Sequence, residues 1–94
     1  MNDAEQERQN LLKQIRLDLG ENPQVKYGPG TFGCHELLDR TALILRLLED
    51  EIIKHPSCIL QPEWFALARE ATTVVCHLYQ KIGGEHLETK PVKP

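Results

Sequence analysis

The stretch His55-Pro-Ser-Cys-Ile-Leu-Gln-Pro62 separates two long segments of helical pattern and decides the fold. Pro56 ends the segment before it, because the residue that precedes a proline avoids helical backbone geometry. Pro62 suits the first position of a new helix, where its missing N–H would have no partner in any case. Short connections make successive helices antiparallel neighbours. The stretch therefore predicts a helical hairpin.

The segment before this turn, residues 33–54, has the apolar spacing of an amphipathic helix. The residues expected to face a core are Leu37, Leu38, Thr41, Ile44, Leu45, Leu48 and Ile52. Leu43 and Leu47 do not fit that stripe and stand one turn apart on another side of the helix. A small protein is not expected to leave such a pair exposed. We expect a second buried surface, either between copies of the chain or beneath an N-terminal helix.

The segment after the turn, residues 62–82, carries a matching apolar stripe. Its members are Trp64, Leu67, Ala68, Ala71, Val75, Leu78, Tyr79 and Ile82. Gly83 and Gly84 predict the end of this helix, since glycine is the usual residue just past a helix C-terminus. The polar, proline-containing residues 84–94 are predicted to be a disordered tail.

An N-terminal amphipathic helix is predicted over residues 1–19. Asp3 can cap it and Gly20 can end it. Leu11 and Ile15 lie on its apolar side. No strand pattern occurs, so the fold class is all-α: an antiparallel hairpin at residues 34–83 plus this shorter helix. A domain of 94 residues buries only about 60–65% of its unfolded surface, so we expect oligomerisation to complete it, with Leu11, Ile15, Leu43 and Leu47 in the interface.

A glycine- and proline-rich linker, residues 20–33, leads into the hairpin. Its glycines let a backbone approach a ligand closely, and the helix N-terminus that follows favours negative charge. Aromatic side chains stack on bases, while arginine and backbone amides hold phosphates. The predicted ligand-binding residues are Lys26, Tyr27, Gly30, Thr31, Phe32, Gly33, His35 and Arg40. Alternatively, Tyr27 and Phe32 plug the open end of the hairpin.

Charge and composition limit the partners and the compartment. The net charge of −3 argues against binding to nucleic-acid polymers, which needs a concentration of Lys and Arg. No apolar run reaches the roughly 20 residues that span a bilayer, and the polar N-terminus is no secretory signal. Three cysteines, an odd number, favour free thiols. We expect a cytoplasmic protein of a bacterial host cell, with no membrane partner.

Metal-dependent and nucleophilic chemistry finds little support in the spacing. Six zinc-type ligands occur, in Cys34-His35, His55-x-x-Cys58 and Cys76-His77. Cys34 and His55 lie at opposite ends of one helix, about 30 Å apart. His35-Glu-x-x-Asp39 lacks the second histidine of a zincin helix. Neighbours on a helix point about 100° apart, so His35 is poorly placed to deprotonate Cys34. We therefore expect no catalytic residues, no metal and no cofactor; a small zinc- or manganese-dependent hydrolase is the minor alternative.

Several motifs give the chain a resemblance to known proteins. The pattern Gly30-Thr-Phe-Gly-Cys-His-Glu-Leu-Leu-Asp-Arg40, then His55-Pro, Pro62-Glu-Trp64 and Leu78-Tyr-Gln-Lys-Ile-Gly83-x-x-His-Leu87, resembles small uncharacterised proteins of phages and prophages. That resemblance rests on residues and implies no activity. By size and architecture, the chain is also similar to phage sponges that sequester the cyclic oligonucleotides of CBASS and Thoeris immunity. The second resemblance implies a homo-oligomer that binds cyclic dinucleotides or trinucleotides between subunits, and it carries over no residue.

The leading hypothesis is a non-enzymatic anti-defence protein that sequesters a small cyclic nucleotide at residues 26–40. Tyr27 and Phe32 would stack on bases, Arg40 would hold a phosphate, and Gly30 and Gly33 would let the backbone close in. The alternative is a protein-interaction module or inhibitor that docks an apolar helix face on a host protein.

Overall fold

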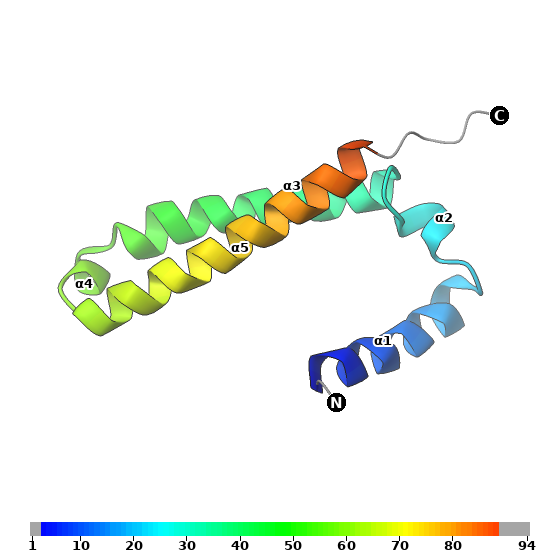
Figure 1. Cartoon of the computed structure of the whole chain (residues 1–94), viewed down its shortest axis with the longest axis horizontal. Helices are drawn as coiled ribbons and strands as arrows, with labels where there is room; N and C mark the ends of the chain where they lie inside the picture. The colour runs from blue at the N-terminus through cyan, green and yellow to red at the C-terminus, as the bar shows by residue number, and fades with distance from the viewer. Residues whose placement is uncertain (1–2, 89–94) are drawn as a thin grey trace.

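The computed structural model describes residues 3–88 of the chain (Figure 1). Its elements in order are α1 (Asp3–Leu19), α2 (Gln24–Tyr27), α3 (Phe32–Leu47), the π-helical η1 (Leu48–Ile53), α4 (Pro56–Ile59) and α5 (Pro62–Glu88). No strand occurs between residues 3 and 88, so the all-α prediction is confirmed for that part of the chain. None of the helices in this range is both long and apolar enough to cross a membrane.

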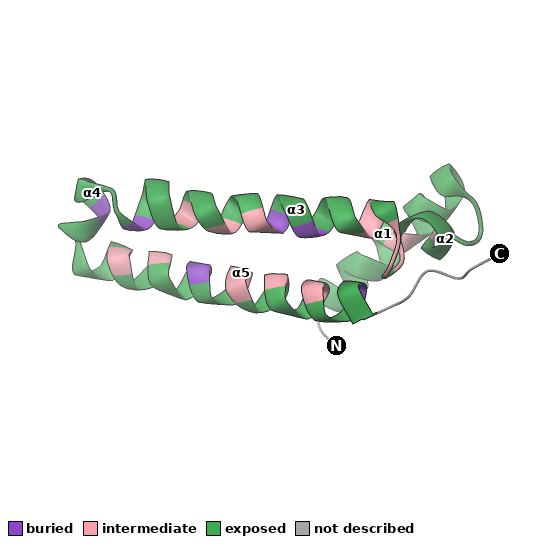
Figure 2. Cartoon of the chain, turned by 90° about the horizontal axis from the view of Figure 1, so that it is seen from above, coloured by how far each residue is buried: buried purple, intermediate pink, exposed green. Residues whose placement is uncertain are grey.

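Two long rods dominate the structure. α3 and η1 form one rod, and α5 returns beside it after the short α4 (Figures 1 and 2). The buried residues lie along the seam between the rods and in the turn that joins them: Leu38, Thr41, Ile53, Cys58, Thr72 and His86. The hydroxyls of Thr41 and Thr72 donate to Leu37 O (2.7 Å) and Ala68 O (2.8 Å) of their own helices. Their polar atoms are therefore satisfied inside the seam.

The first rod changes its helical period at η1. In a regular α-helix Ile53 would lie about 140° around the axis from Leu48. The π-helical i→i+5 pattern places Ile53 above Leu48 instead. Ile53 is consequently buried and Ile52 is exposed. From the sequence, Ile52 was expected to face the core, because the predicted stripe assumed one α-helix through residue 54.

The predicted turn contains one helical turn, α4. Its N-cap is His55, whose Nδ1 accepts a hydrogen bond from the N–H of Ser57 (3.0 Å). Pro56 occupies the first helical turn, and Cys58 is buried beneath it. The chain therefore reverses direction without a long loop.

The second rod does not end at Gly83. α5 continues through both glycines to Glu88, so the predicted helix end is wrong, as is the disordered tail over residues 84–88. The rest of that tail, residues 89–94, lies outside the described residues. A Cβ at Gly83 would lie 3.5 Å from Cδ1 of Leu38, an ordinary van der Waals distance, so Gly83 faces α3. Tertiary packing here outweighs the weak helix propensity of glycine.

α1 stands apart from the two rods (Figure 1). Its α-carbons come within 8 Å of no other helix, and none of its residues is buried. Gly20, at φ +97°, follows its last turn. Local pairing supports its first turns: the guanidinium of Arg8 donates to the Glu5 carboxylate and lowers the pKa of Glu5 to about 2.

Much of the apolar surface predicted to meet a core is exposed. The exposed members of the two predicted stripes are Leu37, Ile44, Ile52, Trp64, Leu67, Ala71 and Leu78. Leu43 and Leu47 are each 44% exposed, and α1 does not cover them. A single chain therefore leaves much of its apolar surface exposed to solvent.

The linker is more ordered than the sequence predicted. It contains α2 and, at its end, the first two residues of α3, Phe32 and Gly33. The predicted boundary between linker and hairpin at residue 33 is therefore late by two residues, because Thr31 already caps the helix.

Candidate functional site

The candidate site is the segment between α2 and α3, whose path is set by Gly30 and Thr31. Gly30 has φ +87°, a conformation that side chains disfavour. The Thr31 hydroxyl donates to Gly28 O (2.6 Å) and accepts from the N–H of Cys34 (3.2 Å). It therefore fastens the turn and caps α3 with one side chain.

His86, near the end of α5, holds this turn from the opposite rod. The N–H of Gly30 donates to Nδ1 of His86 (2.8 Å), and the imidazole is buried. Because Nδ1 accepts, the proton of the neutral ring must sit on Nε2. That nitrogen lies 3.4 Å from Nδ1 of His35.

The same reasoning fixes the second histidine. Nδ1 of His35 accepts from His86, so His35 carries its proton on Nε2, which lies 3.7 Å from Oδ1 of Asp39. The two rings are tilted by 43° with centroids 5.4 Å apart. The structure thus joins His35 to α5 rather than to the predicted ligand-binding surface.

Gly33 brings α2 and α3 into direct contact. A methyl group at Gly33 would overlap the carbonyl oxygen of Lys26 and the ring of Tyr27. The ring of Tyr27 therefore packs on the backbone of the first turn of α3. A glycine is required here because Lys26 and Tyr27 approach its backbone closely. From the sequence, a ligand was expected to make that close approach.

An open hollow of about 330 Å³ lies over this contact. It is lined by Val25, Lys26, Tyr27, Thr31, Phe32, Gly33 and Glu36. Lys26, Tyr27, Thr31, Phe32 and Gly33 of the predicted ligand-binding residues thus come together. Gly30, His35 and Arg40 do not line it.

The two aromatic side chains of the hollow remain accessible. Phe32 is 82% exposed and Tyr27 is 51% exposed. Neither fills the end of the helix pair within one chain, so the plug interpretation does not describe the monomer. Exposed aromatic faces can stack on a planar ligand.

The charges around the hollow are mixed. Lys26 is the cation that lines it, and Glu36 is the anion. Arg40 lies one turn further along α3, with its guanidinium 3.6 Å from the Glu36 carboxylate. Arg40 therefore offsets the charge of Glu36 next to the hollow. From the sequence, Arg40 was expected to bind a phosphate of the ligand instead.

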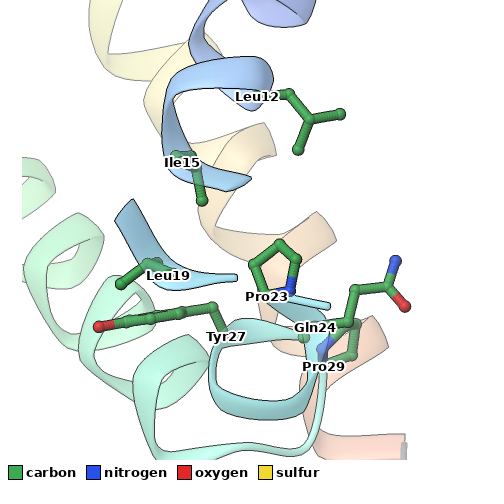
Figure 3. A pocket seen from close by; sticks show the side chains of 8 residues that line it. Leu12, Ile15, Leu19, Pro23, Gln24, Tyr27 and Pro29 are labelled. Carbon is green, nitrogen blue, oxygen red and sulfur yellow. The ribbon is translucent and has the colours of Figure 1, made fainter. Parts of the chain in front are cut away.

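A second, apolar groove of about 520 Å³ lies on the other side of Tyr27, between α1 and α2 (Figure 3). It is lined by Leu12, Ile15, Leu19, Pro23, Gln24, Tyr27, Gly28 and Pro29. Figure 3 shows Leu12 and Ile15 on α1 and Pro23 and Tyr27 beyond them, around the same space. This groove was not predicted from the sequence, although the apolar side of residues 11–19 was its signal.

The predicted zinc-type ligands stay dispersed. Cys34, Cys58 and Cys76 are free thiols. Between residues 3 and 88, no three His, Cys, Asp or Glu side chains are grouped closely enough to hold a metal ion. The groups that the candidate site offers to a ligand are therefore aromatic rings, backbone amides and the side chain of Lys26.

His86 is the site residue that sequence reasoning missed. It was assigned to a disordered tail because Gly83 and Gly84 precede it. The available signal was its spacing: it follows Tyr79 and Ile82 at helical intervals, on the face that packs against α3.

Comparisons of the chain with protein-family models, with curated proteins and with solved structures find no match.

Proposed function

We propose that this chain is a non-enzymatic binding protein that captures a small phosphate-bearing nucleotide in the hollow between α2 and α3. The observation that carries the proposal is the pair of accessible aromatic rings, Tyr27 and Phe32, beside Lys26 on a turn held from both rods. A surface held in this way needs little reordering when a ligand binds.

Each part of the hollow has a role in this proposal. Stacking of one base on Phe32 or Tyr27 is worth roughly 1–3 kcal/mol. Lys26 neutralises a phosphate, and Gly33 lets the ring of Tyr27 pack on the backbone of α3, which holds that ring in place. Glu36 is the unfavourable group, and its ion pair with Arg40 reduces the repulsion.

The ligand class follows from the resemblances and from the form of the site. The rings and the cation suit a cyclic dinucleotide or trinucleotide, which presents bases and phosphates on one compact molecule. The chain would act by sequestration of such a signal in the cytoplasm of a bacterial host, as a phage-type anti-defence protein. Binding without turnover is the activity proposed.

Titration calorimetry with a panel of cyclic dinucleotides and trinucleotides tests the proposal. A ligand that binds should lose about 5- to 150-fold in affinity with Phe32→Ala, since a stacking interaction of roughly 1–3 kcal/mol is removed. The matched control is Leu60→Ala, at another exposed apolar side chain far along the chain. Absence of heat from every nucleotide would remove the proposal.

A homo-oligomer is part of the same proposal. The side chains proposed for the interface from the sequence, Leu11, Ile15, Leu43 and Leu47, are exposed in the chain by 40–57%. Apolar surface of this kind is stabilised when a second copy covers it. Light scattering gives the mass and thereby the number of copies.

A protein-interaction module is the second candidate function, favoured by the same exposed apolar side chains. An inhibitor of a host protein would form a stoichiometric complex with it. Leu43→Asp should break that complex, whereas Arg40→Ala should leave it intact. A complex that forms equally well with both variants contradicts this candidate.

A further inference from the structure

The chain exposes more surface to solvent than a compact monomer of the same mass does. A compact protein of 10.8 kDa exposes roughly 5,500 Å². This chain exposes 7857 Å², and its radius of gyration is 17.0 Å against about 12 Å for a compact domain of the same length. The excess of roughly 2,300 Å² is shared between the separate α1 and the pair of rods, and it exceeds the ~800 Å² that each partner buries in a standard interface.

Most of the exposed apolar residues of the two rods share one helical position. Each of these directly precedes a residue that faces the seam between the rods. The exposed positions, which we call the apolar face, are Leu37, Ile44, Leu47 and Ile52 on the first rod and Leu67, Ala71, Val74 and Leu78 on α5. The residues that follow them are buried or half-buried: Leu38, Leu45, Leu48, Ile53, Ala68, Thr72, Val75 and Tyr79.

One position along a helix turns the side chain by about 100°. Two antiparallel helices are related by a two-fold axis perpendicular to the plane that contains them. Residues that precede a seam residue by one position therefore lie on the same side of that plane in both rods. Ile52 and Trp64, from different rods, indeed line one hollow near the turn.

The opposite side of the pair is polar. Residues that follow a seam position by one include Glu49 on the first rod and Arg69, Thr73 and Gln80 on α5, and these line a common hollow. The pair of rods thus has one apolar and one polar face. Burial against a partner would stabilise only the apolar face.

Charges at the edges of the apolar face show what fits it. His35 lies beside His86, and Leu38 lies beside Gly83. These two pairs show which residue of one rod lies at the same position along the helix pair as a given residue of the other rod. By this count Arg40 lies level with Lys81, and Glu51 lies level with Glu70. The apolar face therefore carries Arg40 and Lys81 on the half towards the open end, and Glu51 and Glu70 on the half towards the turn. Glu85, which directly precedes the buried His86, lies at the open end itself.

We propose that the apolar face is covered by the same face of a second copy, related by a two-fold axis perpendicular to the rods, in a four-helix bundle. The axis crosses the first rod between Leu45 and Arg46. It places Arg40 of each copy over the Glu51 position of its partner, and Lys81 over the Glu70 position. Ile44 of each copy meets Leu47 of its partner beside the axis.

This inference deepens the self-association in the proposed function and is independent of the nucleotide. It also differs from the interface proposed from the sequence, because it does not include Leu11 and Ile15 of α1. Leu11→Glu should therefore leave the dimer intact, while Val74→Glu should dissociate it.

Sedimentation equilibrium on charge variants tests the geometry without disturbing the helices. The first variant, Arg40→Glu with Lys81→Glu, has acidic charges at both ends of the face. The second, Glu51→Arg with Glu70→Arg, has basic charges at both ends. Each variant alone should dissociate about 10- to 100-fold more readily than the unchanged chain, since four cross-partner pairs become repulsive.

Mixing the two variants should restore a dimer of one copy of each. Arg46→Glu with Arg69→Glu, on the polar face, is the matched control and should keep the mass at twice 10.8 kDa. A monomeric unchanged chain at high micromolar concentration, an assembly with an odd number of copies, or a mixture that stays dissociated would each overturn the proposal. Calorimetry with nucleotides reports on the ligand separately, so either proposal can fail alone.

Discussion

α1 and the pair of rods are built from similar amphipathic patterns but differ in what their apolar sides meet. α1 has no buried residue, and its α-carbons approach no other helix. The rods share a seam that buries Leu38 and Thr72. An isolated helix of 17 residues is marginal in water. The pattern alone therefore specifies which side of a helix is apolar, and tertiary packing decides whether that side is covered.

The largest effect should come from the seam. Leu38→Ala removes a side chain that is buried between the rods, and should lower the free energy of unfolding by about 2–4 kcal/mol. Urea denaturation followed by circular dichroism, at fixed protein concentration, measures the change. Leu60→Ala, at a 75% exposed leucine, is the control. Equal losses in the two variants would show that the seam is not the core.

A smaller loss is expected at the join between the turn and α5. His86→Ala removes the acceptor of the Gly30 N–H, and should cost about 1–3 kcal/mol because that donor loses its partner. The same urea titration measures it. His77→Ala, at an exposed histidine of the same helix, should change little. If both histidine variants behave alike, the turn is not held by His86.

The cap of α3 should contribute about 1 kcal/mol. Thr31→Ala removes the hydroxyl that accepts from the N–H of Cys34, while Thr31→Ser keeps it. The serine variant should therefore retain most of the stability in thermal unfolding. Equal melting temperatures for the alanine variant and the unchanged chain would contradict the capping role.

The smallest effect is expected in α1. Leu17 is 80% exposed, so Leu17→Ala should change the free energy of unfolding by less than about 0.5 kcal/mol. Denaturation under the conditions used for Leu38→Ala gives the comparison directly. A loss similar to that of Leu38→Ala would mean that α1 packs against a partner through this residue.

The sequence predicted the elements whose signals are local. Pro56, Pro62 and Gly20 stand at helix boundaries in the structure, as their backbone preferences require. The predicted end of α5 was wrong because the contacts of residues beyond the glycines, above all the hydrogen bond of His86 with Gly30, outweigh glycine propensity. The burial of Ile53 rather than Ile52 depends on the π-helical period of η1, for which the apolar pattern holds no clear signal.

The candidate site was predicted in part. The segment from Lys26 to Gly33 does form a hollow with accessible aromatic rings. The roles of His35 and Gly33 differ from the prediction, since they join α3 to His86 and to Tyr27. Such contacts join residues that are distant in sequence or meet through backbone shape, so no spacing rule reveals them.

The hydrogen bond between Gly30 and His86 has a consequence for the whole molecule. It joins positions 56 apart in the chain, and the ring it closes contains both rods and the turn between them. Closing such a ring costs chain entropy, which the packing of the rods must offset. A molecule that binds the turn in its folded shape would therefore shift the folding equilibrium of the entire helix pair toward the native state.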